Sequence, residues 1–158
     1  MKKEITLILD NIRSSENVGS MFRTADVAGV GKIVLGGITP TPVDRFERPN
    51  TKLVKASLGA EKSVLWEAAK DLAIYIARMK EDGYFIVAIE QAEASVDFKL
   101  LPKIIENKQK VAYVLGNEVE GVQSEILELA DAVVEIPMHG QKESLNVAVT
   151  AGIILFLP

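Results

Sequence analysis

The stretch that decides the fold is Ile136-Pro137-Met138-His139-Gly140-Gln141-Lys142-Glu143-Ser144-Leu145-Asn146-Val147, near the end of a chain of 158 residues. An apolar strand is predicted to end at Ile136, a polar loop follows, and Ser144 or Asn146 starts a final apolar helix. The first turn of a helix carries unpaired N–H groups and a partial positive charge, which suit an anionic or hydrogen-bonding ligand. The alternative is that Ser144 or Asn146 is only an N-cap. His139 is interpreted as a loop residue, because no partner for catalysis is identifiable.

A second polar stretch, Leu115-Gly116-Asn117-Glu118-Val119-Glu120-Gly121, follows an apolar run at residues 111–115. Gly116 is expected to let a ligand approach the backbone closely, and Gly121 to adopt a positive φ. Glu118 follows the carboxyl end of the strand, where open α/β sheets bind ligands. An ordinary glycine-containing turn is the alternative.

A third stretch near the start, Glu16-Asn17-Val18-Gly19-Ser20-Met21-Phe22-Arg23-Thr24-Ala25, places Asn17, Ser20 and Thr24 on one helical face. A polar helical face is usually just the solvated side. Arg23, however, has apolar neighbours, which predicts a partly buried guanidinium whose planar fork binds a phosphate or a developing oxyanion.

The remaining pattern alternates short apolar runs with stretches of helical spacing, which is typical of an α/β domain with a largely parallel sheet. Strands are expected at residues 5–9, 32–35, 85–89, 111–115 and 133–136, with a further short one at 63–65. Helices are expected at residues 17–28, 66–81, 124–129 and 146–157. One domain, residues 1–158, accounts for the whole chain.

Composition excludes several function classes. There is no cysteine and His139 is the single histidine, so disulfides, thiolate nucleophiles and the usual zinc sites are excluded and no metal is expected. The residues before the first strand leave no room for a signal peptide, and no apolar run reaches about 18 residues. We therefore expect a cytoplasmic protein that does not bind a membrane.

Positive charge is concentrated in residues 36–62, although the chain as a whole carries a net charge of −4. This segment has five basic residues (Arg45, Arg48, Lys52, Lys55 and Lys62) and three acidic ones (Asp44, Glu47 and Glu61). It is the best candidate for a surface that contacts phosphates. The alternative is a solvated loop with a short amphipathic helix.

Taken together and in this order, the three stretches resemble the signature motifs of the SpoU family of RNA 2'-O-ribose methyltransferases, within the SPOUT superfamily. The match extends from about Ile5 to Leu155. The resemblance implies an α/β fold with a mostly parallel sheet flanked by helices and a C-terminal trefoil knot. It also implies S-adenosylmethionine as the cofactor, bound in the knot, and a homodimer. The knot is implied by the resemblance alone, because composition and periodicity do not indicate one.

The resemblance assigns roles to residues that match the family's motifs. The catalytic residues it implies are Arg23, Asn17, Glu118, Ser144 and Asn146. The cofactor contacts it implies are Ala88, Ile89, Glu90, Leu115, Gly116, Asn117, Gly121, Ile136, Met138, Ser144, Leu145 and Asn146. The residues expected to contact RNA are Arg13, Arg23, Arg45, Arg48, Lys52 and Lys55.

The chemistry implied is transfer of a methyl group to a ribose 2'-hydroxyl, with tRNA favoured over ribosomal RNA because the chain looks like the small core-only relatives. The family proposal makes the arginine a base, but a guanidinium with a pKa above about 12 stays protonated. We expect Arg23 instead to hold the substrate phosphate and stabilise alkoxide character, while the general base stays unidentified.

Two other functions are compatible with parts of the pattern. A non-catalytic RNA-binding module of the same fold is one, although all five implied catalytic residues are present. A doubly wound nucleotide-binding protein is the other, although no Gly-x-Gly-x-x-Gly follows the first strand.

Overall fold

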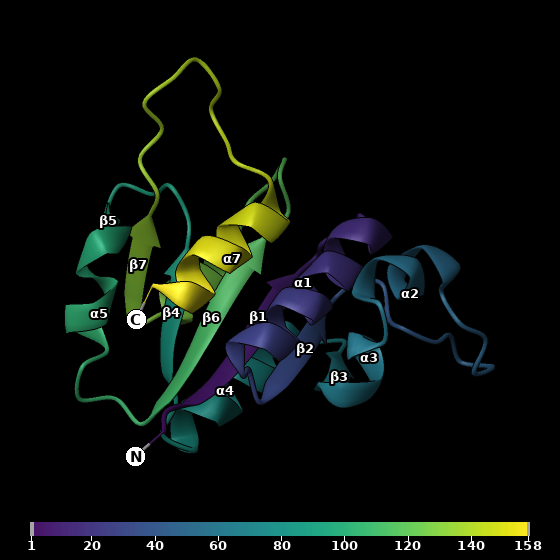
Figure 1. The fold of residues 1–158 in the computed structure, drawn as a ribbon. Coiled ribbons are helices and arrows are strands. Elements are labelled where there is room, and N and C mark those ends of the chain that lie inside the picture. Colours follow the sequence, from purple (N-terminus) through teal and green to yellow (C-terminus); the bar gives the residue numbers. More distant parts are fainter. Residues whose placement is uncertain (1, 158) are drawn as a thin grey trace.

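Short runs rich in Val, Ile and Leu form a single sheet of seven strands in the computed structural model, which describes residues 2–157 (Figure 1). All pairings between strands are parallel, and the order across the sheet is β3-β2-β1-β6-β4-β7-β5. The strands are β1 (Glu4–Asp10), β2 (Lys32–Gly36), β3 (Leu65–Ala69), β4 (Phe85–Ile89), β5 (Val96–Asp97), β6 (Lys110–Gly116) and β7 (Ala132–Glu135). The predicted α/β class with a mostly parallel sheet is confirmed.

Helices cover both faces of the sheet, so the central strands are apolar on both sides. On β6, Val111, Tyr113 and Leu115 join the core on the face of α1 and α7, whereas Ala112 and Val114 join the core on the face of α4 and α6. The helices are α1 (Ser15–Ala28), α2 (Thr51–Ser57), α3 (Ala60–Ser63), α4 (Leu72–Glu81), α5 (Leu101–Ile104), α6 (Ser124–Leu129) and α7 (Val147–Phe156), with a 3₁₀ turn η1 (Phe98–Leu100).

The helix predicted at residues 66–81 is wrong in its first third. Residues 65–69 form β3 at the edge of the sheet, and α4 begins only at Leu72, after Asp71 caps it by accepting the Ile74 N–H at 3.1 Å. Leu65 is 72% exposed. Because β3 is largely exposed, its apolar and polar residues do not alternate strongly. Its Glu and Ala residues have a local preference for helix, and the pairing with β2 overrides that preference. The short strand expected at residues 63–65 overlaps β3 only at Leu65.

Two segments contain elements that the periodicity did not predict. Residues 37–63 hold α2 and α3, of which α2 agrees with the short amphipathic helix in the alternative for residues 36–62, and residues 90–109 hold β5, η1 and α5. These elements span two to seven residues, too few for a helical or strand period to be recognised. No helix within residues 2–157 is long and apolar enough to cross a membrane.

The path of the chain around β7 bears on the predicted knot. Strand β7 lies between β4 and β5, so the segment that joins β4 to β6 by way of β5 passes around it. The chain enters β7 from α6 on one face of the sheet and leaves it for α7 on the other face. This path is consistent with a C-terminal trefoil knot; the knot itself stays a prediction.

Candidate active site

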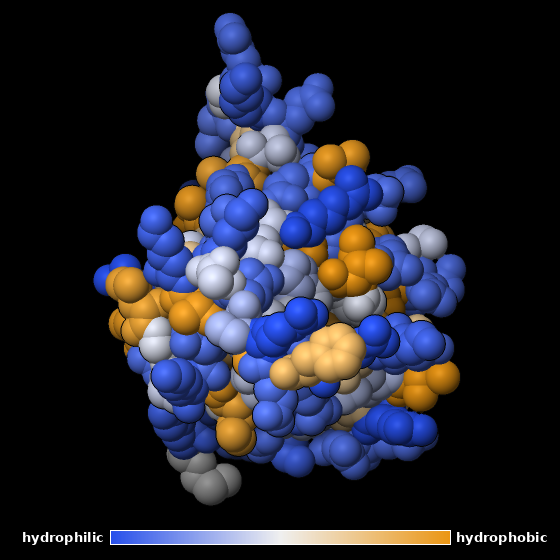
Figure 2. All heavy atoms as spheres, turned by 90° about the vertical axis from the view of Figure 1, so that its right-hand side faces the viewer, coloured by the Kyte–Doolittle hydropathy of each residue, from blue (hydrophilic) through white to orange (hydrophobic). Residues whose placement is uncertain are grey.

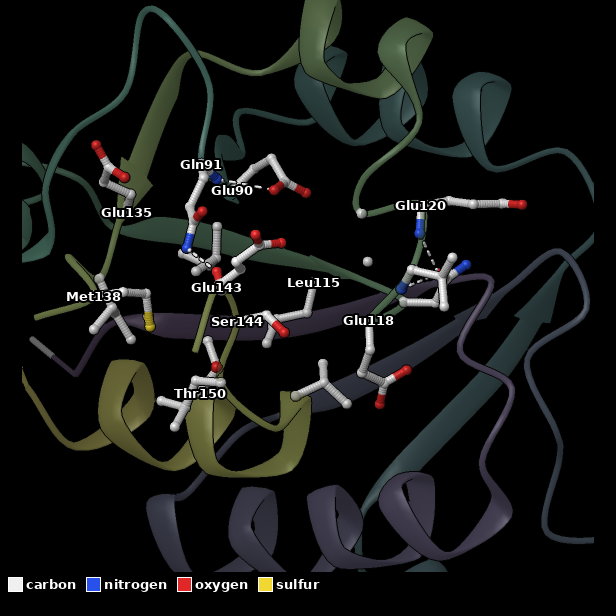
Figure 3. A pocket seen from close by; sticks show the side chains of 18 residues that line it. Glu90, Gln91, Leu115, Glu118, Glu120, Glu135, Met138, Glu143, Ser144 and Thr150 are labelled. Carbon is white, nitrogen blue, oxygen red and sulfur yellow. Dashed lines mark hydrogen bonds between the residues drawn. The ribbon is translucent and has the colours of Figure 1, made fainter. Parts of the chain in front are cut away.

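The carboxyl ends of three neighbouring strands, β4, β6 and β7, open into a pocket of about 330 Å³ that the start of α7 closes from below in the close-up view (Figure 3). Parallel α/β sheets bind ligands at this edge. The residues that line the pocket are Ile89, Glu90, Gln91, Leu115, Gly116, Asn117, Glu118, Val119, Glu120, Gly121, Glu135, Ile136, Met138, Glu143, Ser144, Leu145, Val147 and Thr150.

The loop after β6 is shaped by its own polar groups. The buried Asn117 Oδ1 accepts the N–H groups of Val119 at 3.0 Å and Glu120 at 2.7 Å, and the Gly121 N–H donates to the Asn117 carbonyl at 2.9 Å. Gly121 has a φ of 67°, as predicted. Asn117 therefore acts on the shape of the pocket wall, because its side-chain oxygen is already used within the loop.

Gly116 is required for a reason other than the predicted one. A Cβ atom on it would lie 2.1 Å from the carbonyl carbon of Gly121 and 2.3 Å from the Val122 nitrogen. The backbone that lies where a Cβ would be is thus that of its own loop. Gly116 also lines the pocket, so the close approach of a ligand to it stays a prediction.

Two carboxylates, one on each side of β6, fix the end of this loop. Glu90 accepts the Val122 N–H through Oε2 at 2.8 Å and the Gln91 N–H through Oε1 at 2.9 Å. Asp10, fully buried at the end of β1, accepts the backbone N–H of Gln123 at 2.8 Å and its Nε2 at 2.6 Å. Successive backbone N–H groups are therefore held from two different strands.

Three of the predicted catalytic residues form a continuous hydrogen-bonded chain. Asn146 Nδ2 donates to Asn17 Oδ1 at 3.3 Å, and Asn17 Nδ2 donates to Glu118 Oε1 at 2.8 Å. Asn146 is also the N-cap of α7, because its Oδ1 accepts the N–H groups of Ala148 at 2.8 Å and Val149 at 3.3 Å. The capping role and the contact with the other two motifs thus coexist in one side chain.

The pocket combines negative charge with apolar surface. Its acidic members are Glu90, Glu118, Glu120, Glu135 and Glu143, and its apolar side chains include Ile89, Leu115, Ile136, Met138 and Leu145. The two loops that form the opening are joined by Gln91, whose Nε2 donates to the Glu143 carbonyl at 3.0 Å. This lining favours a ligand that carries both a cation and an apolar or aromatic group.

Not all of the predicted residues reach the pocket. Ala88 is fully buried and does not line it. Asn17 and Asn146 do not line it either and are linked to it by the hydrogen bond from Asn17 to Glu118. Arg13 lies at the rim, where its guanidinium contacts Glu120 at 3.3 Å. The other predicted RNA contacts outside α1 are exposed, with Arg45 and Arg48 before α2 and Lys52 and Lys55 on it.

Arg23 lies away from this pocket in its own chain. It is exposed, which corrects the prediction of a partly buried guanidinium, and it lines a second, shallow hollow with Ser20, Thr24, Val27, Ala56 and Phe156. The apolar neighbours Met21 and Phe22 point instead into the core. Adjacent residues on a helix face different directions, so sequence neighbours do not measure burial.

Sequence reasoning also missed several lining residues, namely Gln91, Val119, Glu120, Glu135, Glu143, Val147 and Thr150, and the loop-holding pair Asp10 and Gln123. The strand-end rule would have found Gln91 and Glu135, because each adjoins a predicted strand end. Thr150, one turn beyond Asn146, follows from helical spacing. Nothing local in the sequence indicates the pairing of Asp10 with Gln123.

Comparison with known proteins decides the family. A model described as the SpoU rRNA Methylase family matches residues 4–156. This chain belongs to the SpoU family. The resemblance inferred from the motifs of this SpoU protein is thus confirmed.

Individual relatives of this SpoU protein are larger. The 23S rRNA (guanosine-2'-O-)-methyltransferase RlmB of Neisseria meningitidis is 33% identical over 152 residues, which are 96% of this chain and 56% of the relative. An AdoMet-bound rRNA methyltransferase from Sinorhizobium meliloti superposes with a TM-score of 0.87 at 31% identity, over 99% of this chain and 56% of that one. A TrmH/SpoU tRNA modifying enzyme of A. aeolicus gives a TM-score of 0.83 at 30% identity, over 99% and 74%. The chain therefore spans about half the length of the curated relatives it matches.

Proposed function

We propose that this chain is an S-adenosylmethionine-dependent methyltransferase that acts on a ribose 2'-hydroxyl of RNA. The observation that carries the proposal is the hydrogen-bonded chain from Asn146 through Asn17 to Glu118, which brings the three motifs of a SpoU protein together beside one pocket. The relatives named above are RNA methyltransferases or RNA-modifying enzymes, and one is described with AdoMet bound.

The pocket's residues fit S-adenosylmethionine. The apolar side chains of Leu115, Ile136 and Leu145 suit the adenine ring, and the glutamates complement the positive charges of the sulfonium and the amino group. When bound, S-adenosylmethionine supplies an electrophilic methyl group. The protein's own contribution is to hold the pocket in shape through the Asn117 loop and its two carboxylate contacts.

On the substrate side, a ribose hydroxyl is a weak nucleophile, so its developing negative charge must be stabilised as its proton leaves. Arg23 performs this task in the proposal by binding the substrate phosphate and the alkoxide, since its guanidinium stays protonated. The hydrogen bond from Asn17 fixes Glu118 Oε1 at the border between the pocket and α1.

The site is completed by a second copy of the chain. Within one chain, Arg23 opens onto a hollow separate from the pocket. Exposed apolar side chains surround that hollow on α1 and α7, with Val27 70% and Phe156 58% exposed, and the two helices lie side by side in Figure 1. A two-fold homodimer through this face would cover them and deliver Arg23 to the partner's pocket. Light scattering at micromolar concentration should give the mass of a dimer; a monomer would contradict this part.

Both tRNA and ribosomal RNA are candidate substrates. Relatives include both 23S rRNA enzymes and a tRNA modifying enzyme. The assay therefore offers tRNA and ribosomal RNA separately, both taken from a strain that lacks the gene, so that target sites are unmethylated.

The proposal is tested with S-adenosylmethionine labelled in its methyl group. Methylation of a 2'-hydroxyl blocks alkaline cleavage of the neighbouring phosphodiester, so label should appear in alkali-resistant dinucleotides. Ser144→Trp, which fills the pocket from an exposed loop position, is the matched inactive variant. Label only in alkali-sensitive mononucleotides would mean methylation of a base and would overturn the ribose assignment.

The rival RNA-binding module is separated by ligand stabilisation. S-adenosylhomocysteine should raise the melting temperature of the wild type and not of Ser144→Trp, while NAD and ATP should leave it unchanged. A module without catalysis would bind RNA yet show no shift with S-adenosylhomocysteine.

A further inference from the structure

Residues 43–49, hereafter the 43–49 loop, form a tight projection before α2 that is visible at the right-hand end of Figure 1. An antiparallel bridge between Val43 and Pro49 closes its base. Asp44 organises the tip, because its Oδ1 accepts the N–H groups of Phe46 at 2.8 Å and Arg48 at 3.0 Å. Its Oδ2 accepts Arg48 Nε at 2.7 Å. Hydrogen bonds from the backbone N–H and then the side chain of Arg48, and from the backbone of Phe46, lower the pKa of Asp44.

Phe46 at the tip is 61% exposed, and two guanidinium groups lie close to its ring. The Arg45 Cζ is 4.8 Å and the Arg48 Cζ 5.0 Å from the centre of the ring. The accessible ring is flanked by cations, and because the turn is already ordered, little conformational entropy is lost when a ligand binds to it. Because the guanidinium groups are planar, the tip presents three flat groups together.

We propose that the 43–49 loop binds an unpaired nucleotide of the RNA, with a base stacked on Phe46 and the flanking phosphates contacted by Arg45 and Arg48. Unpaired RNA bases stack on aromatic rings and on guanidinium planes, and every base has a face that allows it. The inference rests on the proposed function and adds to it a contact with single-stranded RNA outside the methylation pocket.

The surroundings of the loop favour RNA over a protein partner. Figure 2 faces this side of the molecule and shows apolar side chains in small separate groups among hydrophilic ones, without one large continuous apolar area. Lys52 and Lys55, both exposed, continue the positive charge along α2.

The loop is also coupled to the candidate active site. Asn50, directly after it, caps α2 by accepting the Leu53 N–H at 3.2 Å and donates through Nδ2 to Ser15 Oγ at 3.0 Å. Ser15 lies in the first turn of α1, two residues before Asn17. A nucleotide bound to Phe46 is therefore at a fixed position relative to the N-terminal end of α1, which carries Asn17.

The test measures binding of a short single-stranded oligoriboadenylate that carries 2-aminopurine, with duplex RNA of the same length as a second probe. Phe46→Ala should weaken binding of the single strand about tenfold and remove the quenching of 2-aminopurine, while sparing the duplex. Phe46→Trp should retain both the binding of the single strand and the quenching of 2-aminopurine. Ile74→Ala, an exposed apolar position on α4 at the opposite face of the sheet, is the matched control and should change neither.

Salt dependence separates stacking from charge. Phe46→Ala should leave the slope of log affinity against log salt unchanged, whereas Arg45→Gln should reduce that slope by about 1. If the wild type methylates RNA and Phe46→Ala binds the single strand as tightly as the wild type does, the inference is wrong and the proposed function stands. If the wild type neither binds nor methylates RNA, the inference and the proposed function are both wrong. A rise in the wild-type melting temperature with S-adenosylhomocysteine would then show that the cofactor assignment holds and that only the RNA substrate is wrong.

Discussion

Arg23 and Asn17 both lie on helix α1 but at different sites, because six residues of helix separate them by about 9 Å along its axis. Asn17 contacts the pocket of its own chain through Glu118, and Arg23 does not. Arg23→Ala should therefore leave the affinity for S-adenosylhomocysteine unchanged and lower methyl transfer by at least about 100-fold, the scale of one preorganised charge stabiliser. Isothermal calorimetry and the labelled-methyl assay measure the two quantities on the same preparation.

Arg23→Lys sharpens that experiment, because a point charge does not reproduce the planar fork of a guanidinium and should rescue little. Methyl transfer by the alanine variant at near wild-type rate would make Arg23 a structural residue and refute its role here.

Gly116 provides a test of how the pocket wall is built. Gly116→Ala places a methyl group against the backbone of Gly121 and Val122, so the loop must move. We expect the free energy of unfolding to fall by about 1–3 kcal/mol and the stabilisation by S-adenosylhomocysteine to shrink. Gly140→Ala is the control, because nothing lies within 4 Å of a Cβ there and its φ is not positive. Equal stability of the two variants in urea titrations would contradict the close packing.

Tyr113 gives a prediction for high pH. Within residues 2–157, its hydroxyl is the buried side-chain polar atom without a hydrogen-bond partner, and burial raises the pKa of Tyr113 to about 12. Because the folded pKa exceeds the unfolded value of about 10, the folded state binds more protons between these values, and stability falls as pH rises through that window. From pH 10 to pH 12 the wild type should lose about 2 kcal/mol more than Tyr113→Phe does. Chemical unfolding at several pH values measures this difference, and parallel curves for the two proteins would contradict it.

At the scale of elements, the loop after β6 depends on strands that flank β6 on both sides. Asp10→Ala leaves the partly buried Gln123 N–H without its buried acceptor and should cost about 1 kcal/mol of stability, together with weaker binding of S-adenosylhomocysteine. Glu128→Ala, on an exposed position of α6, removes a carboxylate without this consequence. If both variants bind the ligand as the wild type does, the contact from β1 does not position the loop.

The elements that could be predicted from the sequence are those that are buried on both faces or strongly periodic. Strands β1, β4 and β6 are continuous apolar runs, and α1 and α7 follow recognisable polar motifs, so they were found within a few residues. The edge strand β3 was missed because its pairing with β2, and not its own side chains, stabilises it. Most pocket residues were predicted because their motifs resemble those of the SpoU family, whereas Asp10 was missed because its partner is 113 positions away in the chain.

At the scale of the whole molecule, the proposed site needs two chains, with the pocket from one copy and Arg23 from the other. Two variants separate these contributions. Arg23→Ala keeps its pocket and lacks the arginine, and Ser144→Trp keeps the arginine and has its pocket filled.

The most direct test is methyl transfer to RNA by dimers from a strain that co-expresses both variants, each of which should be inactive alone. If Arg23 acts in the partner's pocket, the mixture should recover about one quarter of the wild-type rate, because half of the dimers are mixed and each mixed dimer has one complete site. If the mixture is as inactive as the separate variants while wild-type dimers methylate RNA, the two contributions come from the same chain and the shared site is refuted.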